Sequence, residues 1–243
     1  MDNLVIDLYN KNCIKFGKFT LKNGTTSPIY IDLKNIITYP YLVNLISGFF
    51  INKIKNIETN YICGVPYGGI PVASVISNKT NIPMIMVRKE IKTYGIKRSI
   101  EGEYESGKTC ILIEDTITTG GSINKFINLL WSEGIIVKNV FVICDRRDNT
   151  IVPNLGYKID SLFDISFVFK TLKKHSFIKF NDLNMNYLKN FIFKKYSNFI
   201  DFETKKKLLK TQDKTSSALI SIILKKQTNI CFSMCIQEEI EIE

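Results

Sequence analysis

The sequence predicts an α/β fold with a mostly parallel β-sheet. Between residues 61 and 145, short apolar runs alternate with segments of helical character. The runs are continuous rather than alternating, which is typical of strands that are covered on both faces. Each run also ends in glycines or charged residues. Since ligands of such sheets bind beyond the carboxyl ends of the strands, these ends indicate one shared site.

The first predicted element is a β-hairpin. Its arms are residues 16–22 and 28–32, which are short runs of β-like composition. Asn23 and Gly24 between them are a strong turn signal, because both residues tolerate positive φ. Apolar residues at helical spacing then predict a helix over residues 42–50.

Four apolar runs supply the strands of the predicted parallel sheet, at residues 61–63, 84–87, 110–113 and 140–143. A glycine-rich turn and an apolar segment over residues 70–76 follow the first of them. Between the third and the fourth, an apolar stripe at helical spacing predicts a helix over residues 123–131, and Gly134 ends this helix.

The pattern weakens toward the C-terminus. We expect a first domain over residues 1–196, a polar linker over 197–215 and a short C-terminal segment over 216–243. Within that last segment, residues 216–226 have helical character and residues 228–236 have the composition of a strand.

Composition limits the possible classes of function. Lysine and arginine number 33 against 23 aspartates and glutamates, but much of the excess lies in lysine-rich stretches that are typical of solvated surfaces. No nucleic-acid reading motif is recognisable, and no apolar run reaches the roughly 18 residues of a membrane span. The N-terminus lacks a secretory signal, and the six cysteines are scattered as buried, reduced thiols would be. We therefore expect a cytoplasmic protein without nucleic-acid or membrane partners.

The strongest motif lies in residues 111–122. A buried strand leads into Glu114 and Asp115, and a turn rich in hydroxyls and glycines then opens a helix. Turn amides and hydroxyls at a helix N-terminus bind phosphate, and adjacent carboxylates accept hydrogen bonds from ribose hydroxyls. The alternative is that the acidic pair only caps the helix, although a cap needs one such residue. The spacing differs from the P-loop and from the dinucleotide fingerprint.

This stretch resembles the motif with which type I phosphoribosyltransferases bind 5-phosphoribosyl-1-pyrophosphate (PRPP). Residues 14–148 as a whole resemble orotate phosphoribosyltransferase, especially the form found in bifunctional UMP synthase. Several motifs match in the same order: 16–19, 21–22, 27–32, 63–67, 88–90 with Lys92, 94–95, 97–98 and 145–146. The resemblance implies a type I phosphoribosyltransferase fold, in which helices flank the sheet and a small N-terminal β hood accompanies it. It also implies transfer of the phosphoribosyl group of PRPP to orotate, Mg²⁺ held mainly by PRPP itself, and a homodimer with shared active sites.

The resemblance also implies a role for each matching residue. The 5′-phosphate is expected on Thr118, Thr119, Gly120, Gly121 and Ser122, and the ribose hydroxyls on Glu114 and Asp115. Pyrophosphate is expected on Tyr67, Gly68, Arg88, Lys89 and Lys92. Orotate is expected on Lys22, Tyr30, Ile31, Thr118 and Arg146. Lys92 and Asp115 are the expected catalytic residues, and no protein side chain is expected to bind the metal directly.

Two departures from the family pattern refine these expectations. Some bacterial relatives carry a lysine at the position of Gly68, so the contact there can involve only the backbone in this chain. Tyr94 stands where bacterial enzymes have a loop histidine. In the family, the loop that matches residues 91–105 closes over the neighbouring subunit's site, and Lys92 lies on it.

The residues alone leave simpler interpretations open. Residues 88–98 also fit a solvated basic loop, Arg146 a surface ion pair with Asp145, and Lys22 a charged residue at a strand edge. A non-catalytic regulator that binds PRPP is the alternative function. Such a regulator would keep the motif of residues 114–122 but lose the loop and the base pocket, and Lys92 and Arg146 argue against it.

The C-terminal segment resembles the first helix and strand of an orotidylate decarboxylase barrel. The family strand continues with an aspartate that contacts substrate, and Cys235 stands at that position. A complete barrel needs roughly 200 residues or more. We therefore expect no decarboxylase activity from this chain.

Overall fold

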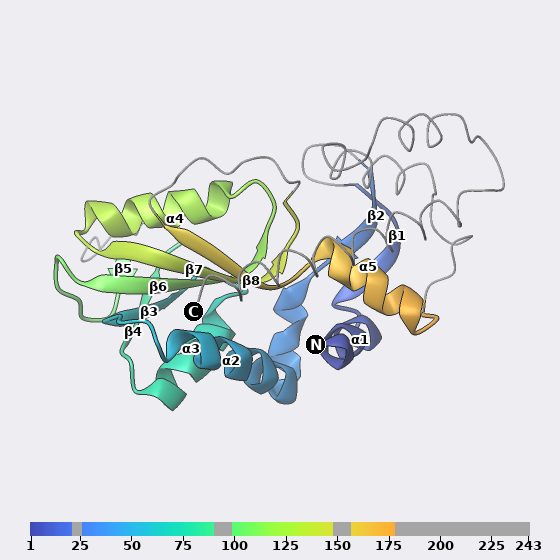
Figure 1. Cartoon of the computed structure of the whole chain (residues 1–243). Helices are drawn as coiled ribbons and strands as arrows, with labels where there is room; N and C mark the ends of the chain where they lie inside the picture. The colour runs from blue at the N-terminus through green and yellow to red at the C-terminus, as the bar shows by residue number, and fades with distance from the viewer. Residues whose placement is uncertain (21–25, 90–98, 148–156, 178–243) are drawn as a thin grey trace, which may run out of the picture. The chain divides into compact units, whose positions relative to one another are not determined.

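The computed structural model describes residues 1–20, 26–89, 99–147 and 157–177. Its centre is a six-stranded sheet in the order β5-β4-β3-β6-β7-β8 (Figure 1). The strands are β3 (Tyr61–Gly64), β4 (Met84–Val87), β5 (Ile100–Glu101), β6 (Thr109–Ile117), β7 (Ile136–Asp145) and β8 (Lys158–Asp164). Every neighbouring pair is parallel except β4 and β5. The predicted α/β fold with a mostly parallel sheet is confirmed.

Helices cover both faces of this sheet, as the continuous apolar runs predicted. Helices α2 (Pro40–Ile54) and α3 (Ile70–Thr80) lie on one face, and α4 (Gly121–Ser132) lies on the other (Figure 1). Successive side chains of each strand point alternately to the two faces of the sheet. Phe141 contacts Phe50 of α2 with ring centroids 5.5 Å apart, while Val140 and Val142 pack with the buried face of α4. Ile123, Phe126, Ile127 and Leu130 of the apolar stripe on α4 are buried, whereas Trp131 at its end is 43% exposed. Gly134 with φ +78° follows this helix.

The predicted hairpin forms a small separate sheet. β1 (Ile14–Thr20) pairs antiparallel with β2 (Thr26–Ile31), whereas the predicted turn at Asn23-Gly24 lies outside the described residues. Helices α1 (Asp2–Asn10) and α5 (Ile165–Lys174) pack on each other, and Phe16 of β1 lies 5.6 Å from Phe169 of α5 between ring centroids. The 3₁₀ helix η1 (Leu33–Thr38) joins the hairpin to α2. This hairpin corresponds to the expected N-terminal hood.

Strand β6 is longer than the apolar run that predicted it. The sequence indicated a strand over residues 110–113, but β6 continues to Ile117. The reason is its neighbour, because β7 pairs with β6 in register as far as Ile117 and Asp145. Glu114 and Asp115 therefore lie within a strand of the sheet rather than beyond its end.

Four cysteines, Cys13, Cys63, Cys110 and Cys144, are buried and form no disulfide, as the sequence predicted. Cys231 and Cys235 lie outside the described residues, as do the predicted linker and C-terminal segment. Among the helices that the structure describes, none combines the length and the apolar character that a membrane span requires.

Candidate functional site

Two buried carboxylates lie at the centre of the candidate site. Glu114 and Asp115 are only 5% and 7% exposed on β6, between β3 and β7. Glu114 Oε1 accepts a hydrogen bond from the Asp115 amide at 3.0 Å, and Asp115 Oδ1 accepts one from the Thr116 amide at 2.7 Å. These backbone bonds orient both carboxylates next to the carboxyl end of the strand.

A glycine turn after β3 runs directly against this acidic pair. The Val65 amide donates to the Ile113 carbonyl at 2.8 Å, which ties the start of the turn to β6. A side chain at Gly69 would overlap the Ile113 carbonyl, and one at Gly68 would overlap the carboxylate of Asp115. The lysine of some bacterial relatives is therefore not interchangeable with Gly68 here. Both positions need glycine because two strand ends meet at this point.

The third part of the site is the N-terminus of α4. Gly120 with φ +79° turns the chain into this helix, and no side chain caps it. Thr118, Thr119, Gly121 and Ser122 are exposed around this turn. Uncapped helix amides, the positive end of the helix dipole and exposed hydroxyls are the groups that bind a phosphate. The sequence-predicted phosphate turn, residues 118–122, thus begins directly after β6 ends at Ile117.

Burial, together with the side-chain hydrogen bond and the negative charge of neighbouring Asp115, raises the pKa of Glu114 to about 9. Lys34 on η1 acts against this shift and lowers the pKa of Glu114. The pKa of Lys34 itself is raised: partial burial lowers it, but the negative charges of Asp115 and Asp32 outweigh that effect. Nothing in the sequence marks Lys34 as part of the site, because a single lysine after a hairpin belongs to no motif.

The raised pKa of Glu114 predicts a pH-dependent stability. A carboxyl whose pKa is higher in the folded than in the unfolded chain contributes its full stability to the fold below its ordinary pKa of 4.5. That contribution is lost as the pH rises toward the folded-state pKa of about 9. Glu114→Gln removes this loss. The difference in free energy of unfolding between Glu114→Gln and the wild type should therefore shift in favour of the variant between pH 5 and pH 9, by at most about 1.4 kcal/mol per pH unit.

Urea unfolding at several pH values measures this difference. Glu105→Gln is the matched control, because Glu105 is exposed and its substitution should give a nearly constant difference. A constant difference for Glu114→Gln as well would mean that Glu114 is ionised in the folded protein.

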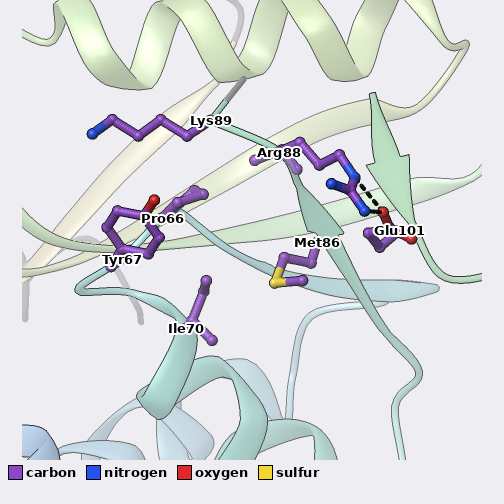
Figure 2. A pocket seen from close by; sticks show the side chains of 8 residues that line it. Pro66, Tyr67, Ile70, Met86, Arg88, Lys89 and Glu101 are labelled. Atoms are coloured by element: carbon purple, nitrogen blue, oxygen red, sulfur yellow. Dashed lines mark hydrogen bonds and ion pairs between the residues drawn. The ribbon is translucent and has the colours of Figure 1, made fainter. Parts of the chain in front are cut away.

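Cationic side chains line a cavity of about 290 Å³ beside the glycine turn. Figure 2 shows Lys89 and Arg88, consecutive in the chain, pointing to opposite sides of it. The Lys89 ammonium lies 5.4 Å from the centroid of the Tyr67 ring, and Arg88 forms an ion pair with Glu101. Of the residues expected to bind pyrophosphate, the structure therefore brings Tyr67 and Lys89 together but directs the Arg88 guanidinium toward β5.

Arg146 follows the end of β7, on the same edge of the sheet as the acidic pair. Its backbone amide donates to the Ile117 carbonyl at 2.8 Å. Asp145 binds the next residue instead: Arg147 Nη2 lies 2.7 Å and Nε 3.1 Å from Asp145 Oδ2. The interpretation of Arg146 as the ion-pair partner of Asp145 is therefore wrong. Within the described residues no carboxylate pairs with the Arg146 guanidinium.

The remaining predicted residues are placed in part. Tyr30 and Ile31 end β2, where Tyr30 is exposed beside Phe19, with ring centroids 5.4 Å apart, and Ile31 is buried. Lys22 and Lys92 lie outside the described residues, as does Tyr94. No cluster of three or more potential metal-ligating side chains occurs in the part of the chain that the structure describes.

The comparison with known proteins agrees with this geometry. Residues 33–171 match the model of the phosphoribosyl transferase domain. The chain is 33% identical to bovine uridine 5′-monophosphate synthase in an alignment that covers all of this chain and 54% of that protein, so it spans about half the length of that relative. It is 36% identical to orotate phosphoribosyltransferase of Pyrococcus horikoshii, across 70% of this chain and 93% of that enzyme.

Solved structures give the same result. UMP synthase of Leishmania donovani superimposes with a TM-score of 0.67 and 33% identity, over 74% of this chain and 40% of that one. Orotate phosphoribosyltransferase of Aeropyrum pernix superimposes with a TM-score of 0.61, over 72% of this chain and 99% of that one. At 24% identity the second match shows the shared fold.

Proposed function

Because this chain belongs to the phosphoribosyltransferase family, and to the orotate phosphoribosyltransferases within it, we propose that it transfers the phosphoribosyl group of PRPP to orotate. The products are orotidine 5′-monophosphate and pyrophosphate, and the reaction is a step of pyrimidine nucleotide synthesis. The observation that carries the proposal is the convergence of three parts at one edge of the sheet. These are the acidic pair on β6, the glycine turn after β3 and the uncapped N-terminus of α4.

Each part has a distinct task in the proposed reaction. The α4 N-terminus binds the 5′-phosphate with the amides and hydroxyls of residues 118–122, and Glu114 and Asp115 accept hydrogen bonds from the ribose hydroxyls. Departure of pyrophosphate leaves positive charge on the ribose. Asp115 can stabilise that charge, whereas Glu114 and residues 118–122 act by positioning. The buried carboxylate of Asp115 lies next to the Gly68 backbone, where it can offset that charge.

The pyrophosphate side of the site is cationic. Tyr67 and the Gly68 backbone form one wall, and Arg88, Lys89 and Lys92 supply the positive charge. Mg²⁺ prefers oxygen ligands and would be held mainly by the oxygens of PRPP, while the buried Glu114 and Asp115 would bind the ribose hydroxyls of the same molecule. It would neutralise the leaving pyrophosphate.

Orotate is an anion, and Arg146 with Lys22 is the proposed counter-charge. A guanidinium binds a carboxylate through two parallel hydrogen bonds. Arg146 is suited to this role because its backbone is anchored to Ile117 and because Asp145 binds Arg147 instead. Thr118, Tyr30 and Ile31 complete the proposed base pocket.

We further propose a homodimer in which Lys92 serves the partner's site, and a cytoplasmic location. The four buried cysteines that form no disulfide support a reducing compartment. Tyr41 and Leu45, four residues apart on α2, are exposed and give that helix an apolar face suited to association. A single-chain mass in sedimentation equilibrium would contradict the dimer.

An orotate absorbance assay with PRPP and Mg²⁺ tests the proposed activity. Consumption of orotate is expected with both present and not when PRPP is omitted. Adenine, hypoxanthine and uracil should not be used, because none supplies the carboxylate for Arg146. Binding of PRPP without any turnover of orotate would favour the non-catalytic regulator instead.

A further inference from the structure

The ion pair between Arg88 and Glu101 is unexplained by the roles described so far. Figure 2 shows the Arg88 side chain extending to Glu101 across the cavity wall, on the side opposite to Tyr67 and Lys89. Arg88 is one of the cations of the proposed pyrophosphate site, so a carboxylate bound to it affects that site directly.

The backbone brings this carboxylate to Arg88. Strand β5 consists of Ile100 and Glu101 and pairs antiparallel with β4, with Glu101 opposite Met86. The Arg88 amide donates to the Ser99 carbonyl at 2.9 Å, which extends the ladder by one step. Glu101 is thus held beside Arg88 by the register of two strands rather than by a chance surface encounter.

The geometry of the pair leaves most of the guanidinium available. Arg88 Nε and Nη2 both contact the same Glu101 oxygen, Oε1. A guanidinium has five N–H donors, and these contacts use two of them on one side. The other three, on Nη1 and Nη2, remain for a second anion. One carboxylate can therefore orient Arg88 while a pyrophosphate oxygen binds its free edge.

Stability is a poor explanation for this arrangement. The two side chains are 29% and 36% exposed, and ion pairs of such exposure contribute roughly 0–1 kcal/mol to folding. Orientation is a better one. An arginine side chain loses conformational freedom when it binds an anion, and a residue that has already restricted it removes part of that entropic penalty.

We propose that Glu101 is a positioning residue for the pyrophosphate site, which orients the Arg88 guanidinium for the leaving group. This inference rests on the proposed function, because it takes the anion at Arg88 to be pyrophosphate. The alternative is that Glu101 competes with the anion: it would then occupy the Arg88 guanidinium and weaken anion binding.

The experiment compares Glu101→Ala, Glu101→Gln, Arg88→Ala and the double variant Arg88→Ala/Glu101→Ala with the wild type. The readouts are the KM for PRPP, the KM for orotate and the affinity for inorganic pyrophosphate with Mg²⁺ by calorimetry. Asp160→Ala is the matched control, since it removes a carboxylate of similar exposure that pairs with Lys53 rather than with Arg88.

Glu101→Ala should raise the KM for PRPP and weaken pyrophosphate binding by about 3- to 10-fold, with the KM for orotate unchanged. Glu101→Gln should retain most of the wild-type affinity for PRPP and pyrophosphate, because the glutamine amide oxygen still accepts hydrogen bonds from Arg88. The double variant should bind pyrophosphate no more weakly than Arg88→Ala, and Asp160→Ala should behave like the wild type. Tighter pyrophosphate binding by Glu101→Ala, or a double variant weaker than Arg88→Ala, would overturn the proposal. A wild type that binds pyrophosphate but does not consume orotate would refute the proposed activity alone, since the calorimetric comparison still decides the role of Glu101.

Discussion

Replacing Arg146 with alanine is expected to reduce kcat/KM for orotate by roughly 100-fold while PRPP affinity changes less than about twofold. A hydrogen-bonded charge contributes about 1.5–3 kcal/mol, and each 1.4 kcal/mol corresponds to a factor of ten. Arg146 meets the conditions for such a contact. Its backbone is fixed to Ile117 at the end of β6, and the carboxylate that precedes it is already bound by Arg147.

Arg147→Ala is the matched control for Arg146→Ala. The two arginines are adjacent, so both variants lose one positive charge at the same edge of the sheet. Arg147 pairs with Asp145 and is about four-fifths buried with it, so its loss should lower the thermal midpoint while orotate kinetics change only a few-fold. Steady-state kinetics with each substrate varied in turn separate the two cases. An equal loss of orotate use and PRPP binding in Arg146→Ala would mean that this arginine serves folding.

The core of this site could be predicted from the sequence because its parts are local. The strand, the acidic pair, the phosphate turn and the start of α4 are continuous in residues 111–122, so a short window contains the geometry. The place of Arg146 could be predicted because it follows an apolar run that ends at the same edge of the parallel sheet, but its orotate-binding role was implied only by the family resemblance. The length of β6 was predicted less well, because pairing with β7, rather than apolar composition, extends this strand to Ile117.

Contacts that depend on register between distant segments could not be predicted. Glu101 reaches Arg88 through a two-residue antiparallel strand that no composition signal marks, and Lys34 faces Asp115 through a 3₁₀ helix. Strand β8 was also missed, because its polar Lys158, Asp160 and Ser161 interrupt the apolar pattern at the edge of the sheet. Helices α1 and α5 were not predicted either. Both are short, and they pack on each other and on the hairpin.

Substituting Gly68 with alanine is expected to lower kcat/KM for PRPP by about 100-fold. The new methyl group would occupy the space of the Asp115 carboxylate and would lie 2.7 Å from the Asp115 Cβ. Rotation of the carboxylate alone cannot relieve a contact with Cβ, so the turn and β6 must move apart. A displacement of about 1 Å at a reacting centre can reduce a rate by about 100-fold.

Gly48→Ala is the matched control for Gly68→Ala. Gly48 lies inside α2, has no heavy atom within 4 Å of the added methyl group, and makes no contact with the site. Glycine inside a helix is less stable than alanine by about 0.5–1 kcal/mol, so Gly48→Ala should raise the thermal midpoint and leave kcat/KM unchanged. Gly68→Ala should instead remain folded and lose PRPP use more than orotate binding, because Asp115 contacts the ribose in the proposed complex. Wild-type kinetics in Gly68→Ala would show that Asp115 can move without consequence, and its proposed catalytic role would then be wrong.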